Sequence, residues 1–451
     1  MARTERGATQ DTVRRHNLAT LLGHLHRHGP TSRARLTRLL GLNRATIGYL
    51  VDDLVSRGLV EERPETEQAA RGRPSKVVAA RSDLCQVLAV QVGVDAIEVA
   101  LVGLGGVVLG RRRAAVSRAG DRAVEHVVRT VTRLAGQLLG LATGPVVGVG
   151  VAVPGSVSPG GDTVYFAPNL RWSQVPLADL LAERLGLGPL VSVANDANLG
   201  AIAEHSRGVG IHSNDLIYLH AEVGVGGGII TGGQMLAGAR GYAGEVGHMQ
   251  VNPSGMACHC GSRGCWETEV GEDALVRRVG LPPGGRSKVE LVLRRARAGD
   301  PVCLEAVEST AQWISVGLVN MVSALDPEMV ILGGVFEEIL ELARPTLVER
   351  LGRSARYFHP NGVVLVRPKF GRSAVLVGAA ELGFQAVLGD PAMMPPLAAR
   401  DHAAPLAIGR VRPGSRAMSR MPQTHPGPRP IQETNSESAL RLERAAAAGS
   451  G

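Results

Sequence analysis

The spacing of apolar residues changes near residue 84, and this change constrains the fold more than any other feature of the chain. Before it, leucines recur at intervals of three and four residues, the period of an amphipathic helix. After it, strand-like apolar runs alternate with helical stretches such as 122–140. The pattern predicts a helical N-terminal unit followed by an α/β domain. A chain of 451 residues also exceeds what one hydrophobic core usually organises, so several folded units are expected.

Three short helices are predicted within the first 80 residues. Ser32 and Asn43 are placed to cap the second and the third, and Gly41 allows a tight turn between them. The residues expected to face inward are Leu18, Leu21, Leu22 and Leu25 in the first helix, Leu36, Leu39 and Leu40 in the second, and Ile47, Leu50, Val51, Leu54 and Val55 in the third. The last two helices predict a helix-turn-helix.

A wing and a DNA-reading face are expected next to these helices. The pairs Leu59-Val60 and Val77-Val78 suit a two-stranded wing. In a winged helix-turn-helix the third helix enters the major groove. The residues expected to contact DNA from its exposed face are Arg44, Thr46, Gly48 and Tyr49. A three-helix bundle that contacts protein instead of DNA has the same pattern, so that alternative stays open.

The charge distribution favours a nucleic-acid partner for the N-terminal unit. Residues 1–80 carry a net charge of +6, residues 391–451 carry +4, and the stretch between them carries −2. A basic module on a mildly acidic body is typical of a DNA-binding unit fused to another domain. Arg71 and Arg73 are expected to reach a narrow minor groove beside the wing, although a basic linker would look the same.

The two ends of the chain predict its surroundings. Residues 389–451 are rich in Pro, Arg, Ser and Ala without any period, which predicts a disordered tail. The N-terminus lacks the apolar core of a signal peptide, and no run approaches the 18 or so apolar residues of a spanning helix. We therefore expect a cytoplasmic protein with no membrane partner.

Three of the five cysteines crowd into one short segment, which favours a metal site over disulfide bonds. Cys258, Cys260 and Cys265 follow His248 within the segment 245–267. Three thiolates and one imidazole form a closed tetrahedral set for a structural zinc ion. Reduced cysteines in a glycine-rich loop are the alternative.

This segment resembles the signature of the ROK family, a group of repressors and sugar kinases, and the resemblance extends from the helix-turn-helix to about residue 388. It implies a two-lobed actin-like, sugar-kinase (ribonuclease H-like) fold behind the winged helix. The expected domains are 1–80 for the winged helix, 81–200 for the N-terminal lobe and 201–388 for the C-terminal lobe with the zinc loop.

The resemblance also implies a sugar site. The residues it assigns to sugar contacts are Asn169, Asn195, Asp196, Glu245, His248 and Glu267. Carboxylates and amides supply the fixed acceptors and donors that a ring of hydroxyls needs. In kinase members the aspartate at position 196 is the general base.

The nucleotide half departs from the family pattern. Gln91 stands where kinases have an acid, and Asp95 stands where they have a hydroxyl. Glu222 replaces the first glycine of a Gly-Thr-Gly turn, and of the nucleotide-binding turns only the glycine pair at 333–334 survives. Acids at these positions repel phosphate oxygens, so loss of ATP binding and of enzyme activity is expected.

Together these features predict a sugar-responsive transcriptional repressor. It would bind an inverted repeat of double-stranded DNA as a homodimer or homotetramer, hold zinc, and respond to a sugar or sugar phosphate. Two alternatives stay open: an active sugar kinase with a DNA-binding appendage, and a ligand-independent DNA-binding protein whose sugar site is a relic.

Overall fold

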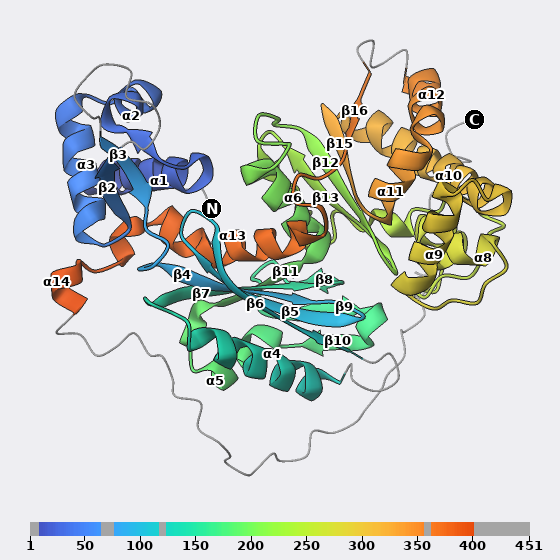
Figure 1. The fold of residues 1–451 in the computed structure, drawn as a ribbon, viewed down its shortest axis with the longest axis horizontal. Coiled ribbons are helices and arrows are strands. Elements are labelled where there is room, and N and C mark those ends of the chain that lie inside the picture. The colour runs from blue at the N-terminus through green and yellow to red at the C-terminus, as the bar shows by residue number, and fades with distance from the viewer. Residues whose placement is uncertain (1–8, 65–75, 117–122, 356–361, 401–451) are drawn as a thin grey trace, which may run out of the picture. The chain divides into compact units, whose positions relative to one another are not determined.

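The computed structural model describes residues 9–64, 76–116, 123–355 and 362–400 (Figure 1). The N-terminal unit consists of helices α1 (Gln10–His28), α2 (Arg33–Leu40) and α3 (Arg44–Ser56) and strands β1 (Thr31–Ser32), β2 (Val60–Pro64) and β3 (Lys76–Ala80). The strands pair antiparallel with β3 in the middle. This unit is the winged helix-turn-helix that the sequence predicts.

The two predicted caps define the turn between α2 and α3. The side chain of Asn43 accepts a hydrogen bond from the backbone N–H of Thr46 at 2.8 Å, and Ser32 accepts one from Arg35 at 3.3 Å. Each cap satisfies a backbone donor that the first turn of a helix leaves without a partner. Both caps are therefore confirmed.

Most of the predicted inward faces are confirmed, and two positions are wrong. The four leucines of α1, Leu36, and the residues Ile47, Leu50, Val51 and Leu54 are buried. Leu39 and Val55 are instead 51% and 38% exposed. Each lies at the edge of the apolar stripe of its helix, where no neighbouring element covers it.

The first lobe is a five-stranded sheet in the order β11-β7-β4-β5-β6. Its strands are β4 (Gln86–Val92), β5 (Ala96–Gly103), β6 (Val107–Ala115), β7 (Val146–Val153) and β11 (Val191–Asn195). Helices α4 (Val124–Leu139) and α5 (Leu177–Leu185) cover one face (Figure 1). A small sheet of β8 (Ser156–Val157), β9 (Val164–Ala167) and β10 (Trp172–Val175) lies beside it. Turn η1 (Pro168–Leu170) connects β9 to β10, and turn η2 (Gly188–Leu190) precedes β11.

The second lobe repeats the strand order of the first, as β14-β13-β12-β15-β16. Its strands are β12 (Leu216–Ala221), β13 (Val225–Thr231), β14 (Gln234–Met235), β15 (Met329–Gly334) and β16 (Val364–Val366). Its helices are α7 (Trp266–Val270), α8 (Glu272–Arg278), α9 (Arg286–Arg297), α10 (Pro301–Leu325), α11 (Val335–Leu342) and α12 (Arg344–Ala355), with turns η3 (Val246–His248) and η4 (Gly371–Ser373). In both lobes an antiparallel meander of three strands continues into two parallel strands, which is the expected ribonuclease H-like arrangement.

Two helices connect the lobes. Helix α6 (Asp196–Arg207) starts where β11 ends, so the domain boundary expected at residue 200 falls inside this helix. Helix α13 (Ala374–Gly389) returns from the second lobe and packs on β4, β7 and α6. The first lobe is therefore built from two separate stretches of the chain.

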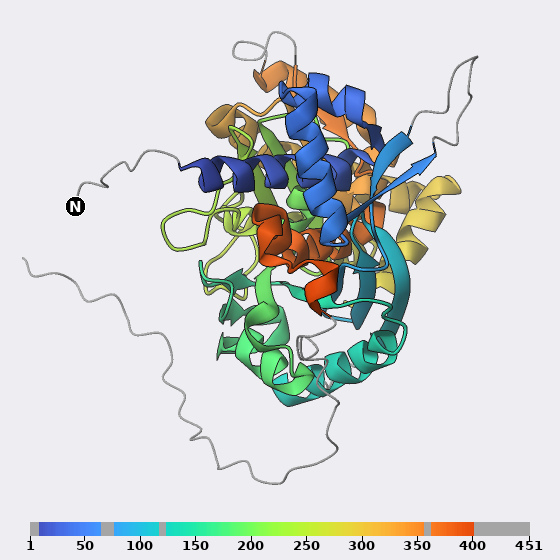
Figure 2. The same cartoon turned by 90° about the vertical axis from the view of Figure 1, so that its left-hand side faces the viewer.

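The winged helix shares a hydrophobic core with the first lobe. One continuous cluster of buried side chains includes Leu21 and Leu54 of the winged helix, Val87 of β4, and Phe384 and Val387 of α13. Figure 2 faces the winged helix and shows the orange C-terminal helices next to its blue helices. Because the two units bury apolar surface against each other, the winged helix is docked on the body by packing as well as by its linker.

The described chain stays folded beyond the predicted start of the tail. Residues after α13 form the turn η5 (Pro391–Met393) and the short helix α14 (Leu397–Arg400). The guanidinium of Arg57 donates hydrogen bonds to the carbonyls of Ala392 and Met394, at 3.0 and 2.5 Å. The rest of the expected tail, 401–451, lies outside the described residues. Within the described part of the chain, every helix is too short or too polar to cross a bilayer.

Gly150 on β7 is expected to be required for the packing of α13. A Cβ atom at this position would collide with the backbone carbonyl of Ala379. We predict that Gly150→Ala lowers the free energy of unfolding by about 2 kcal/mol or more, because a helix backbone must move. Gly136→Ala is the matched control: its Cβ meets nothing within 4 Å, and it should be neutral or stabilise α4 by about 0.5–1 kcal/mol. Chemical denaturation measures both, and equal effects would contradict the prediction.

Candidate functional site

Four potential metal ligands meet in the loop before α7. The donor atoms of His248, Cys258, Cys260 and Cys265 all lie within 4.8 Å of one another. Cys258 Sγ is 3.7 Å from His248 Nδ1, and Cys260 Sγ is 3.6 Å from Cys265 Sγ. Ligands bound tetrahedrally to zinc, with Zn–S near 2.3 Å, are separated by about 3.6 to 3.8 Å. The cluster therefore fits a metal ion of this kind.

Without a cation, the surroundings of Cys258 favour its neutral thiol. Burial raises the pKa of the Cys258 thiol, and the Glu267 carboxylate 2.9 Å from its sulfur adds to this effect. A thiolate at this position needs a positive charge beside it.

A buried tryptophan anchors the end of this loop. Trp266 is fully buried, its ring N–H donates to the carbonyl of Trp313 at 2.9 Å, and its backbone N–H donates to Met249 at 2.8 Å. The loop is thereby attached to α10 on one side and to the segment that carries His248 on the other. Glu267 follows directly and projects toward the same histidine.

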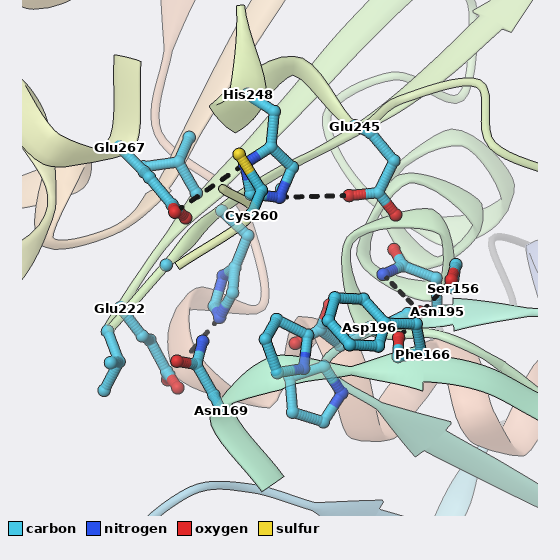
Figure 3. A pocket seen from close by; sticks show the side chains of 18 of the residues that line it. Ser156, Phe166, Asn169, Asn195, Asp196, Glu222, Glu245, His248, Cys260 and Glu267 are labelled. Carbon is cyan, nitrogen blue, oxygen red and sulfur yellow. Dashed lines mark hydrogen bonds and ion pairs between the residues drawn. The ribbon is translucent and has the colours of Figure 1, made fainter. Parts of the chain in front are cut away.

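One cavity of about 300 Å³ brings all six expected sugar-contacting residues together (Figure 3). They come from four parts of the chain: the turn η1, the adjoining ends of β11 and α6, the turn η3 with the residue before it, and helix α7. Their side chains point toward a common space in Figure 3. The residues are Asn169, Asn195, Asp196, Glu245, His248 and Glu267.

The N-terminus of α6 forms the first-lobe wall of this cavity. Asn195 caps the helix by accepting from the backbone N–H of Asn198 at 3.0 Å, and its amide donates to the carbonyl of Gly155 at 3.1 Å. Asp196 accepts from the backbone N–H of Ala197 at 2.8 Å. Burial raises the pKa of Asp196 to about 6, and Glu222 adds to this while His220 opposes it.

The second-lobe wall joins the cavity to the metal ligands. His248 Nδ1 faces Cys258, whereas Nε2 lies 3.9 Å from Glu245 Oε2. Glu267 Oε1 is 3.7 Å from His248 Nδ1. The imidazole thus has one nitrogen toward the cysteines and the other toward the cavity, and Glu245 and Glu267 flank it on either side.

A second cavity of about 400 Å³ lies where the expected nucleotide positions meet. Gln91, Asp95 and Glu222 line it together with Arg286 and Arg372. Arg286 pairs with Glu272 and Glu290, both at 3.3 Å, and with Glu338, while Arg372 pairs with Glu290 at 3.2 Å. Burial raises the pKa of Glu272 to about 7, against the opposing charge of Arg286. Charged side chains that already have partners therefore occupy much of this cavity wall.

Comparison with known proteins decides the family. Residues 87–386 match the ROK family, and residues 19–71 match the MarR family. The chain belongs to the ROK family. It is 29% identical to a protein named xylose repressor from Caldicellulosiruptor bescii, over 80% of this chain and 93% of that protein.

Two solved ROK structures have the same fold. A ROK family transcriptional regulator, described as a homologue of the E. coli MLC protein, gives a TM-score of 0.68 at 24% identity, covering 84% of this chain and 97% of its own. A ROK glucokinase from Streptomyces griseus, solved with glucose and AMPPNP, gives 0.56 at 31% identity, covering 66% and 99%. The first of these likenesses is a likeness of fold, and it includes the winged helix.

Several cavity residues of this ROK chain were missed by sequence reasoning. His220 lies at the end of β12 with its Nε2 3.5 Å from the Glu222 carboxylate. Phe166 and Tyr242 also line the cavity, and both are nearly half exposed. The sequence held one indication for Phe166 and Tyr242: aromatic residues make up only 3% of the chain, so each is a candidate for a specific role. Exposed rings at a cavity mouth suit the apolar face of a sugar.

The expected DNA-reading face of this ROK chain is accessible on α3. Arg44 and Tyr49 are exposed, with Tyr49 at 59%, whereas Thr46 and Gly48 are half-buried. The guanidinium of Arg14 lies 5.9 Å from the Tyr49 ring centroid and orients it from α1. The other two expected contacts, Arg71 and Arg73, lie outside the described residues.

The buried carboxyl of Asp196 is expected to cost stability. Its pKa of about 6 exceeds the unfolded value of 3.8, so the folded state binds the proton more tightly. The penalty for ionisation is absent below pH 3.8, grows as the pH rises, and is complete above pH 6, at up to about 3 kcal/mol. Asp196→Asn should therefore be increasingly more stable than the wild type between pH 4 and 7.5, measured by denaturation without ligand. Asp179→Asn, exposed on α5, is the control, and a constant difference for Asp196→Asn would contradict the prediction.

Proposed function

We propose that this ROK protein is a sugar-responsive transcriptional repressor. The observation that carries the proposal is the convergence of six carboxylate, amide and imidazole side chains on one cavity, in a body that shares its core with a winged helix. The similarity to a protein named xylose repressor over most of both chains supports it. As a regulator it would act inside the cell, on an inverted repeat, as a dimer or tetramer.

The proposed sugar contacts comprise hydrogen-bond acceptors and groups that can also donate. Asp196, Glu245 and Glu267 accept hydrogen bonds from hydroxyls, and Asn169 and Asn195 can both donate and accept. His248 presents Nε2 to the cavity because its other nitrogen faces the cysteines. Hydrogen bonds between sugar hydroxyls and ionised carboxylates are stronger than those between neutral groups.

The proposed DNA contacts are Arg44, Thr46, Gly48 and Tyr49 of α3, together with Arg71 and Arg73, which lie outside the described residues. Arg44 can donate twice to a guanine, and Tyr49 can reach a base or a phosphate. The accessible face of α3 supports the first four.

We also propose that the nucleotide half has lost its function. A nucleoside triphosphate placed in the second cavity would meet Glu222, Asp95 and the Arg–Glu pairs instead of hydroxyls and backbone donors. Acids at these positions add repulsion to the phosphates.

An active sugar kinase is the second candidate. The pKa of Asp196 near 6 suits a general base, and the similarity to a ROK glucokinase favours this reading. Sugar-dependent release of ADP by the wild type, abolished in Asp196→Asn, would establish it.

Zinc is the proposed metal, held by His248, Cys258, Cys260 and Cys265. When bound it supplies a rigid cross-link for the loop, and the chain itself positions Glu245 and Glu267 on either side of the histidine.

Loss of zinc is expected to weaken sugar binding before it weakens operator binding. We expect one zinc per chain by elemental analysis, and a lower zinc affinity for Cys260→Ser because one of four ligands is lost. Cys303→Ser, a buried cysteine on α10 away from the cluster, is the matched control and should retain zinc. If chelated protein kept full sugar affinity, the loop would not depend on the metal.

The deciding experiment is binding of the intact protein to DNA upstream of its own and neighbouring genes, at stated salt, with and without a panel of sugars. Specific binding that one sugar weakens is the expected result. Tyr49→Ala should weaken operator binding by roughly fivefold or more, because a base-contacting residue contributes about 1–3 kcal/mol. Tyr165→Ala, in the first lobe, should leave operator binding unchanged. Absence of specific DNA binding under all conditions would overturn the proposal.

A further inference from the structure

Among the described residues, the sugar cavity is lined by four acids, and its basic side chains are imidazoles alone. Asp196, Glu222, Glu245 and Glu267 face it, and the described residues of its wall include no lysine and no arginine. Its only other titratable side chains apart from the tyrosine and the cysteine are the imidazoles of His220 and His248. Proteins bind phosphate groups with arginine, lysine or a free helix N-terminus. The cavity supplies neither of the first two.

The helix N-terminus that faces the cavity is already occupied. The first backbone donors of α6 are taken by Asn195, which accepts from Asn198 at 3.0 Å, and by Asp196, which accepts from Ala197 at 2.8 Å. A carboxylate thus stands where the helix dipole would attract an anion. This end of the cavity suits hydroxyl groups and repels a phosphate.

Arginine side chains line the second cavity instead: Arg111, Arg113, Arg286 and Arg372. Glu222 and Val223 line both cavities, and the Glu222 side chain is 50% exposed. Burial alone would raise the pKa of Glu222, but the bond and charge of His220, aided by Arg286, outweigh it and lower that pKa. A phosphate on the sugar would therefore meet an ionised carboxylate before it reached Arg286, which three glutamates already neutralise.

We propose that the effector is an unphosphorylated, uncharged sugar, and that Glu222 is the residue that rejects its phosphate esters. This inference rests on the proposed sugar-sensing function and narrows its ligand class.

The test compares each free sugar with its own phosphate. Direct calorimetric binding to the intact protein is measured for D-xylose and D-xylose 1-phosphate, D-glucose and D-glucose 6-phosphate, and N-acetyl-D-glucosamine and its 6-phosphate. One free sugar should bind at least about tenfold more tightly than its phosphate. In Glu222→Gln that preference should fall by about threefold or more, whereas Glu305→Gln, exposed on α10, should retain it.

Each outcome separates this inference from the function it rests on. A phosphate ester that binds as tightly as its free sugar overturns the inference and leaves the sugar-sensing repressor intact. An unchanged preference in folded Glu222→Gln overturns the role of Glu222. If specific operator binding is found but no member of any pair binds, the sugar-sensing function fails, and this inference with it.

A second, independent observation concerns the far end of α6. Arg207, its last residue, lies 3.4 Å from Glu381 of α13 and 3.2 Å from Nε2 of His26 on α1, and its guanidinium also donates to the carbonyl of Gly105. His26 and Glu381 are buried. The winged helix, α6 and α13 therefore meet at one buried group of charged and polar side chains.

His26 is held from both sides of its ring. The backbone N–H of Gly105 donates to His26 Nδ1 at 2.9 Å, and His26 Nε2 lies 3.0 Å from Glu381. Burial alone would raise the pKa of Glu381, but His26 and Arg207 outweigh it and lower that pKa. The carboxylate is thus a shared partner of the DNA-binding unit and of α6.

We infer that α6 transmits ligand occupancy to the winged helix. Its first residue, Asp196, lines the sugar cavity, and its last, Arg207, contacts the group around His26, about 18 Å away along one helix. A displacement of the α6 N-terminus by a bound sugar shifts Arg207 relative to Glu381 and His26, since a helix moves as a rigid element. The docking of α1 on the body then changes.

The test measures coupling rather than affinity. Operator affinity is determined with and without D-xylose, or the tightest-binding of the free sugars above. Sugar affinity is determined with and without operator. Each pair of measurements gives a coupling ratio, and linkage requires the two coupling ratios to agree. Arg207→Lys and Glu381→Gln should bind operator and sugar separately within about threefold of the wild type, but their coupling ratio should fall toward one. Arg184→Lys, which pairs with Glu125 on the surface of the first lobe, should retain the wild-type ratio.

A folded Arg207→Lys or Glu381→Gln protein, verified by its Tm, with an undiminished coupling ratio would overturn this relay. A wild-type protein without coupling would instead overturn the proposed function, so the two failures are distinguishable.

Discussion

The close packing of α13 on strand β7 is the contact on which the rest of the structure depends. It needs a glycine at position 150, because any Cβ there meets the helix backbone. Packed there, α13 completes the first lobe and contributes to the core that this lobe shares with the winged helix. It also places Glu381 within hydrogen-bonding distance of His26. A helix from the end of the described chain thus joins the DNA-binding unit to the sheet that carries the proposed sugar site.

The electrostatics of the cavity follow from where its carboxylates are buried. Asp196 has an elevated pKa because it has little solvent and acidic neighbours, whereas Glu222 stays ionised because His220 stands beside it. Two acids that line one space therefore have opposite shifts. Ionised and neutral carboxyls suit hydroxyl groups, which donate and accept, better than they suit phosphates.

The metal loop and the sugar cavity share residues. His248 faces cysteine sulfurs with one nitrogen and the cavity with the other, and Glu267 contacts both Cys258 and the histidine. The buried Trp266 attaches the loop to α10. A change in the geometry of the cysteine–histidine cluster therefore alters the contacts of two proposed sugar-binding acids, Glu245 and Glu267.

The sequence by itself determined the features that depend on neighbours along the chain. The helix-turn-helix with its two caps, the strand pattern of the lobes and the spacing of the metal ligands all follow from local periodicity and side-chain chemistry. The proposed sugar contacts could be assigned from the sequence only through the family signature, since they come from four separate parts of the chain.

Only the tertiary structure decided how those parts meet. Three features cannot be detected from the periodicity of the sequence. They are the return of α13 to the first lobe, the pairing of His26 with Glu381 across 355 residues of sequence, and the position of Glu222 in the walls of two cavities. Their physical reason is the burial of surfaces that come together only when distant elements pack. The same reason explains Leu39 and Val55, whose exposure depends on which neighbours cover a helix rather than on the helix itself.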